Sequence, residues 1–357
     1  MAMTNEQLTK WIDEIFGTID EIKVNSGDIT NLSKTVKTQG ETITALQDVV
    51  AAANAASHNA QYRGDDITTR SWCEADQDGY ITADGLNALY TRIADGSFED
   101  IFIGDYFKIS MTSDYGTEDV TCVIADLDTF LNTGDTTLSD HHAVIIPDKI
   151  FNTLAPMNST GTTGVSQNPD NPVGSSAEAG NRKGGYLGCD LRQLVLPKYA
   201  TALATVFGTH LLSYRSVFDK ATTLEVVSSG YTGWSGASSE IEWTTSILEL
   251  LNENQVFGSN IFSSSGVNVG LNNTQLSYFR HNPSAKIKFT GSNRIHWWLR
   301  SVASGTSFSN ASFRGYVLSA TASDSSGVCP FWLIGKAPVT QTTQTRKTKK
   351  TLTKKED

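Results

Sequence analysis

The cysteines and histidines are the residues most able to act as nucleophiles or zinc ligands, and their spacing matches none of the common motifs. The four cysteines stand at positions 73, 122, 189 and 329, and none belongs to a Cys-x-x-Cys pair. Because zinc sites need closely spaced ligands, this pattern predicts free buried thiols rather than a metal centre. The chain also lacks the Gly-x-Ser-x-Gly, His-Glu-x-x-His and P-loop motifs. We therefore expect no metal, no cofactor and no enzymatic activity.

An adjacent histidine pair and an acidic turn come nearest to a metal site. His141 and His142 are neighbours in an expected strand, where successive side chains point to opposite faces. One packed ring and one exposed ring are therefore expected. The stretch EADQDGYITADG contains Asp76 and Gly79 as a calcium loop would, but Gly85 stands where such a loop needs a bidentate Glu. An Asp/Gly turn is the preferred interpretation, and a calcium site is the alternative.

Among the elements expected from the sequence, the first is a long helix with an apolar repeat in the first 55 residues. β-Branched residues recur at intervals of seven from Ile15 to Val50. A lone helix drifts off such a repeat by about 20° per heptad, so the pattern indicates a supercoil with partner helices, and a lone surface helix is the alternative. Isoleucine at both a and d favours three strands. The predicted trimer interface consists of Ile12, Ile15, Ile19, Ile22, Ile29, Leu32, Val36, Gln39, Ile43, Leu46 and Val50.

The second apolar row of this repeat changes sides. Ile12 and Ile19 flank the spine in the first half, and Leu32 and Leu46 flank it on the other side in the second half. The change amounts to a three-residue stammer over residues 25–27, where we predict a break or kink. About 40 residues of such a helix would form a stalk roughly 60 Å long.

Composition divides the chain into four parts. We predict a stalk over residues 1–55, a neck over 56–65, a globular head over 66–336 and a disordered basic tail over 337–357. Between positions 338 and 357 there are six Lys or Arg residues and two Asp or Glu residues. A segment with so few apolar side chains cannot bury a core. A solvated tail is therefore expected, and an arm that docks on an acidic surface is the alternative.

Charge and hydropathy exclude several classes of partner. The net charge of −10 disfavours nucleic acid. The N-terminal stretch MAMTNEQLTKWIDEIF is acidic and amphipathic, unlike a signal peptide. No run reaches the roughly 18–20 apolar residues of a membrane span. We expect synthesis in a cytoplasm and no membrane insertion.

The head is predicted to be of the α+β class, with short strands and many loops. Strands are expected in YFKISM, DVTCVIADL and HHAVIIPD, and a helix over residues 83–94. A further helix is expected from about Leu191, with Pro197 beginning a second segment. The stretch TSILELLNENQVFG predicts another helix, which ends at Gly258.

Several stretches together resemble one group of virion proteins. They include YRGDDIT, FEDIFIGDYF, APMNSTGTTG, GGYLGCDLR, FGTHLLSYR, NTQLSYFRHNP, WWLRSVAS and GVCPFWLIG, in that order. The group is that of head-fibre or virion-fibre proteins of tailed phages and prophages. Its globular part is thought to be related to C-type lectins and to the formylglycine-generating enzyme. The closing motif usually reads Gly-Val-Arg-Pro, but position 329 here is Cys329. The cysteine lacks the guanidinium group of arginine, with its several hydrogen-bond donors. Any salt bridge that the arginine forms at this position in the related proteins is therefore in doubt here.

The resemblance implies a homotrimer on the exterior of a virion, attached to capsid, collar or tail proteins through its N-terminal helix. Our leading hypothesis is a fibre whose lectin-like head binds a host-surface or mucus glycan. A capsid or collar decoration protein is the alternative. An oxidase of the formylglycine-generating type is disfavoured, since it needs a close cysteine pair.

The resemblance also indicates a recognition surface between two aromatic anchor strands. The anchors would be Trp297, Trp298 and Trp332. The exposed contact residues would be Ser307, Phe308, Asn310, Ser312 and Arg314. A merely solvated strand-and-loop surface is the alternative at these positions.

Overall fold

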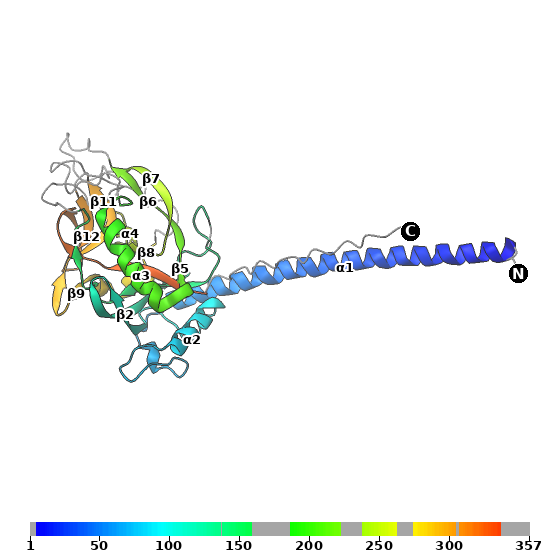
Figure 1. Cartoon of the computed structure of the whole chain (residues 1–357), viewed down its shortest axis with the longest axis horizontal. Coiled ribbons are helices and arrows are strands. Elements are labelled where there is room, and N and C mark those ends of the chain that lie inside the picture. Colours follow the sequence, from blue (N-terminus) through cyan, green and yellow to red (C-terminus); the bar gives the residue numbers. More distant parts are fainter. Residues whose placement is uncertain are drawn as a thin grey trace, which may run out of the picture. The chain divides into compact units, whose positions relative to one another are not determined.

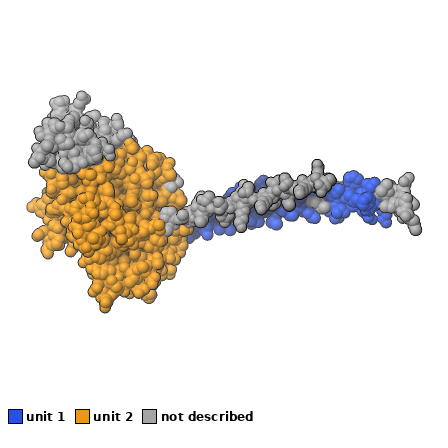
Figure 2. All heavy atoms as spheres, in the orientation of Figure 1, with its two compact units in different colours: residues 1–54 blue, residues 55–357 orange. Residues whose placement is uncertain are grey.

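A computed structural model shows an α+β protein with a long N-terminal helix and a curled antiparallel sheet (Figure 1). The structure describes residues 5–136, 138–158, 186–222, 238–262, 274–304 and 307–336. The predicted tail over 337–357 and the side chain of Ile22 lie outside the described part. Two compact units are present, residues 1–54 and 55–357 (Figure 2).

Helix α1 (Asn5–Asn59) is continuous, so the predicted break at residues 25–27 is wrong. Thr30 Oγ1 donates to the Ser26 carbonyl at 2.9 Å inside this segment. A stammer changes the phase of the apolar stripe without interrupting the backbone hydrogen bonds, so the helix runs through it. The helix also includes residues 56–59 of the predicted neck, which continue the alanine-rich run over 51–56, a run of high helix propensity.

The last turn of α1 belongs to the head unit and is tied to it by side-chain hydrogen bonds. The Asn59 side chain donates to the Leu127 carbonyl and accepts from the Leu127 N–H, each at 2.9 Å. The His281 ring contacts the Asn59 carbonyl at 2.9 Å. His58 stacks on Phe102, with ring centroids 4.7 Å apart. This end of the helix is therefore fixed by specific polar contacts rather than by a loose neck.

The main sheet follows the order β1-β2-β3-β15-β5, with β8 also paired to β15, and all its pairs are antiparallel. Its strands are β1 (Tyr106–Ser113), β2 (Gly116–Leu127), β3 (His142–Pro147), β5 (Leu211–Leu212), β8 (Leu248–Leu250) and β15 (Pro330–Gly335). β1 alternates buried and exposed residues, whereas β3 and β15 are buried throughout. β1 therefore has one solvated face, and the continuous apolar runs of the central strands reflect cover on both faces.

A second sheet has the order β13-β12-β11-β14-β4, in which only the β11–β14 pair is parallel. Its strands are β4 (Leu154–Ala155), β11 (Trp297–Ser304), β12 (Ser307–Ala311), β13 (Val317–Thr321) and β14 (Ser326–Gly327). Two separate antiparallel ribbons are formed by β6 (Tyr214–Thr222) with β7 (Ser238–Ser246), and by β9 (Lys288–Thr290) with β10 (Asn293–Ile295).

The helices of the head are short and cover the main sheet. α2 packs against β3 and β15, and α3 packs against β1. The helical segments of the head are η1 (Ile67–Thr69), α2 (Ala83–Ala94), η2 (Leu191–Val195), α3 (Leu196–Phe207), η3 (Gly208–His210), α4 (Glu253–Phe257), α5 (Ser277–His281) and η5 (Pro283–Lys286). The predicted helix over 83–94 is confirmed, and Thr82 caps it by accepting from the Gly85 N–H.

The helix predicted from TSILELLNENQVFG is only partly present. Residues 248–250 form β8, and α4 begins after Asn252, whose side chain forms a capping box with Gln255. Gly258 ends the helix at φ 82°, in the left-handed region, as the sequence predicted.

The three predicted anchor tryptophans are all fully buried, so their place in the core is confirmed. Trp297, Trp298 and Trp332 each have 0% exposure. The Trp297 indole donates to the Lys286 carbonyl at 2.9 Å, and the Trp298 indole donates to the Ala155 carbonyl at 2.7 Å. These bonds give both buried indole N–H groups a partner and fix the first end of β11.

Candidate functional site

The apolar stripe of α1 is exposed to solvent in the single chain. Ile29, Leu32, Val36, Ile43, Leu46 and Val50 have exposures between 57 and 68%. Ile12, Ile15 and Ile19 are 38 to 40% exposed, and Gln39 is exposed as well. A contiguous row of this length is costly in water, and such rows mark contact surfaces.

The predicted recognition residues are mostly inside the head, which corrects the expectation that they are exposed. Phe308, Asn310 and Ser312 are buried, Ser307 is half-buried, and only Arg314 is exposed. Strand β12 pairs with β11 on one side and β13 on the other, and four of its five residues are buried. The alternation of small polar residues therefore does not mark a solvated face here.

Two serines in and next to β12, Ser309 and Ser312, form internal hydrogen bonds instead. Ser309 donates to the carboxylate of the fully buried Glu253. Glu253 also accepts from the N–H groups of Ile261 and Phe262, at 2.6 and 3.1 Å. Ser312 accepts from the Arg314 N–H at 3.1 Å in the turn that follows. This polar interior holds the loop after α4 against the second sheet.

The histidine pair matches the prediction only in part: one ring is packed, but the other is half-buried and precedes strand β3 instead of lying in it. His142 is fully buried, and burial lowers its pKa. Its Nε2 accepts from the Phe130 N–H at 3.0 Å. His141 Nδ1 lies 2.7 Å from Asp128 Oδ2, and this side chain is 18% exposed. Both rings therefore have structural partners.

The other sequence candidates also take structural roles. Asp76 accepts from the Asp78 and Tyr80 N–H groups at 2.9 and 3.0 Å, which makes the predicted Asp/Gly turn. All four cysteines are free and buried, as expected. Burial raises the pKa of Cys329 to about 11, which suppresses thiolate chemistry. Among the described residues no group of three or more His, Cys, Asp or Glu side chains is placed to hold a metal.

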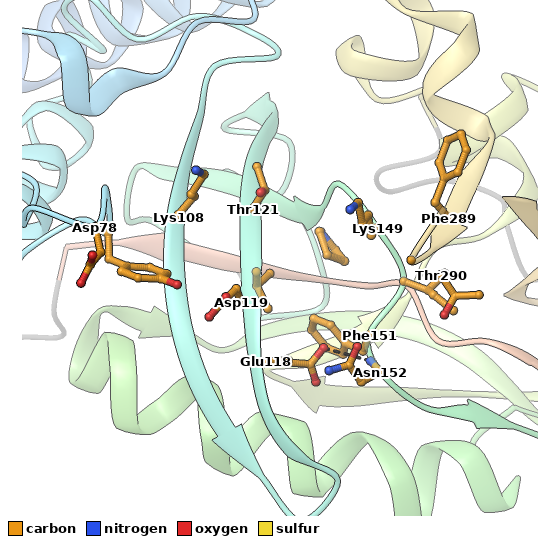
Figure 3. A pocket seen from close by; sticks show the side chains of 15 residues that line it. Asp78, Lys108, Glu118, Asp119, Thr121, Lys149, Phe151, Asn152, Phe289 and Thr290 are labelled. Carbon is orange, nitrogen blue, oxygen red and sulfur yellow. Dashed lines mark hydrogen bonds between the residues drawn. The ribbon is translucent and has the colours of Figure 1, made fainter. Parts of the chain in front are cut away.

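A polar pocket of about 270 Å³ lies beside the β1–β2 hairpin (Figure 3). Its walls come from the 78–80 turn, β1, β2, the loop after β3, and β9. Backbone hydrogen bonds join these segments: Asp148 N–H donates to the Thr121 carbonyl at 2.9 Å, and Ile150 N–H donates to the Phe289 carbonyl at 3.3 Å. The buried Lys288 ammonium donates to the Pro147 and Asp148 carbonyls at 2.8 and 3.0 Å. The pocket walls are thus held rigidly together.

A buried carboxylate lines this pocket. Glu118 is 7% exposed, and burial raises its pKa above the usual range. Its Oε2 accepts from the Asn152 N–H at 2.9 Å. The Tyr199 hydroxyl hydrogen-bonds with the same carboxylate, which offsets part of the rise in its pKa. Glu118 therefore has internal partners, and the exposed carboxylates of the pocket are those of Asp78 and Asp119.

Charges of both signs surround the same pocket. Lys108 and Lys149 are exposed at its rim, and neither forms an ion pair with any described residue. Asp119 lies next to the Tyr80 hydroxyl, and this hydrogen bond raises the pKa of Tyr80. No sequence motif predicted the pocket, because its walls come from five separate segments of the chain.

A second hollow, about 470 Å³, lies between α3 and the β7–β8 segment. Glu249 and Arg192 form a buried ion pair in its wall, with Arg192 Nη2 2.8 Å from Glu249 Oε1. The Tyr186 hydroxyl donates to Glu249 Oε2 at 2.6 Å. Because the pair is already satisfied by internal partners, we assign it to stability rather than to ligand binding.

No protein-family model matches the chain, and searches of curated proteins and of solved structures find no match. Across the described residues no helix is both long and apolar enough to cross a membrane.

Proposed function

We propose that this protein is a homotrimeric virion fibre whose lectin-like head binds a host-surface or mucus glycan. The observation that carries the proposal is the exposed apolar stripe on the uninterrupted helix α1, joined to a head with its own buried core. Three copies would bury this stripe in a coiled coil, with isoleucine at a and d favouring the three-stranded form. The resemblance of the head motifs to phage fibre proteins supports the virion setting.

A trimeric display would compensate for a weak individual site. One shallow glycan site with a dissociation constant near 1 mM contributes about −4 kcal/mol. Linking several such sites raises the overall avidity by about 10²–10⁴ when the geometry lets them bind together. The N-terminal part of α1, which carries the exposed Trp11, is the segment we propose for attachment to capsid, collar or tail proteins.

The trimer is tested by sedimentation equilibrium of the full-length chain at micromolar concentration. We expect a mass three times the 38.7 kDa of one chain. A monomer at this concentration would contradict the proposal. The binding partner is tested by screening the same preparation on an array of bacterial surface polysaccharides and mucin glycans, where we expect retention on at least one polymer.

A decoration protein that stabilises the capsid or collar is the second candidate. It is favoured by the burial of Phe308, Asn310 and Ser312, which removes most of the contact surface predicted for the head. Particles that lack the protein would then open at a lower temperature than complete particles, and the array would show no retention. Intact thermal stability of the depleted particles would exclude this function.

A further inference from the structure

We infer that the pocket beside the β1–β2 hairpin is the ligand site of the head and that it takes an uncharged, hydroxyl-rich sugar ring. This inference rests on the proposed glycan-binding function and names the residues and the class of sugar. The pocket lies outside strand β12, where the sequence placed the contact residues.

The exposed carboxylates in the pocket call for a ligand that donates hydrogen bonds. Asp78 and Asp119 are exposed in the pocket lining, whereas the buried Glu118 carboxylate is already held by the Asn152 N–H and the Tyr199 hydroxyl. A sugar hydroxyl donates to an exposed carboxylate oxygen and accepts from another group at the same time. Lys108 and Lys149 supply donors at the rim for that second bond.

The balance of charge at the pocket disfavours ionised ligands of either sign. Asp78, Glu118 and Asp119 line the same space as the two lysines. An anionic sugar would face three carboxyl groups, and a cationic sugar would face two ammonium groups; like charges at close range are repulsive. A neutral ring with many hydroxyl groups uses the acceptors and the donors together.

The size and the aromatic lining of the pocket fit one sugar unit rather than an extended chain. Its volume of about 270 Å³ lies just below the ~300–1,000 Å³ typical of sites for drug-sized ligands. Asp78 and Phe289 stand at opposite ends of the pocket (Figure 3). Tyr80 and Phe289 are both half-buried, so they offer ring surface against which the C–H face of a sugar can pack.

The ligand class is tested by saturation-transfer NMR on the full-length protein. The probes are D-glucose, D-galactose and D-mannose, together with D-galactosamine and D-galacturonic acid as charged counterparts of galactose. We expect saturation transfer to at least one neutral hexose and weaker transfer to both charged sugars. No transfer to any neutral hexose, or the strongest transfer to a charged sugar, would overturn the inference.

The position of the site is tested with exposed pocket residues, whose exchange leaves the core intact. We expect Asp119→Asn and Lys108→Gln to weaken binding of the best hexose by about tenfold each, since each removes a charged hydrogen-bonding group. Asp114→Asn and Lys198→Gln serve as matched controls. Asp114 and Lys198 form an exposed ion pair 3.4 Å apart outside the pocket lining. Equal affinity in pocket and control variants would refute the location.

The failure of this inference and the failure of the proposed function give different results. A trimer that is retained on the array, with pocket variants binding as well as the controls, overturns the pocket and leaves the fibre intact. A monomer that is not retained on the array, yet transfers saturation to a hexose only when the pocket is unchanged, overturns the fibre and supports the pocket.

Discussion

Helix α1 and the head place their apolar residues in opposite ways. In the 1–54 unit, Ile29 and Leu32 are 68 and 64% exposed, whereas in the 55–357 unit Trp298 and Trp332 are fully buried. The head therefore buries its large hydrophobic residues within a single chain, whereas the N-terminal helix leaves its own exposed. In the proposed trimer, the stability of the stalk would come from other chains and depend on concentration, while the stability of the head would not.

The most direct test of this difference places a charge in the apolar stripe of α1. We expect Ile43→Asp to abolish the trimer, because three carboxylates in one buried layer would cost more than about 5 kcal/mol per trimer. Sedimentation equilibrium would then show single chains, while the unfolding midpoint of the head stays unchanged. Thr38→Asp, which lies off the predicted a and d positions, is the control and should leave the mass unaltered.

The converse variant damages the head alone. Trp298→Ala removes a fully buried ring and its hydrogen bond to the Ala155 carbonyl, and should lower the free energy of unfolding of the head by about 3–5 kcal/mol. Urea denaturation followed by near-UV circular dichroism measures the loss. Trp11→Ala, at a position 54% exposed, should change the same quantity by less than about 0.5 kcal/mol. Similar losses from both variants would mean that the two units do not differ in this way.

A smaller effect is expected at the buried ion pair of the head. Glu249→Gln leaves the Arg192 guanidinium without its counter-charge and should cost about 3 kcal/mol in urea denaturation. The double variant Arg192→Met with Glu249→Gln removes both charges and should recover part of that loss. If the loss in the double variant equals the sum of the losses in the two single variants, the pair is not the coupled unit described above.

The smallest effect is a pH dependence that resides in the head. Burial raises the pKa of Asp126 to about 6, although it accepts from the Ser277 and Leu127 N–H groups at 3.0 Å. Because the folded pKa lies above the unfolded value of about 3.9, the head gains stability as pH falls through 6. Between pH 7 and pH 5 this group should add about 1 kcal/mol.

The contribution of Asp126 is isolated by difference. Asp126→Asn should remove this gain, so the stability difference between the original chain and the variant should change by about 1 kcal/mol from pH 7 to pH 5. Thermal unfolding at a series of pH values measures it. A difference that does not change with pH would mean that Asp126 keeps an ordinary pKa in the folded head.

The sequence predicted those parts of the fold that local patterns determine. The helix α2 was predicted with its bounds, because Thr82 supplies a cap and the apolar residues that follow recur with helical spacing. The tryptophan anchors were expected from the resemblance to lectin-like folds, and all three rings are buried. The continuity of α1 was not predicted, because the stammer alters the phase of the apolar side chains but leaves the backbone helical.

The candidate site could not be predicted in the same way. The pocket joins residues around positions 78, 118, 149 and 289, and no local pattern reports that these segments meet. The burial of Asn310 and Ser312 was missed for a related reason. Whether a small polar residue lies inside or outside depends on distant partners, such as the hydrogen bond from Ser309 to the buried Glu253.

Strand β15 has a consequence for how the head is made. It pairs with β3, β5 and β8, which are separated from it by up to about 190 positions of chain, yet it is the last strand of the fold. During synthesis, β3, β5 and β8 therefore lack this pairing partner until residues 330–335 have been made. A chain shortened before Pro330 would therefore lack the central strand of its main sheet and would be open to proteolysis.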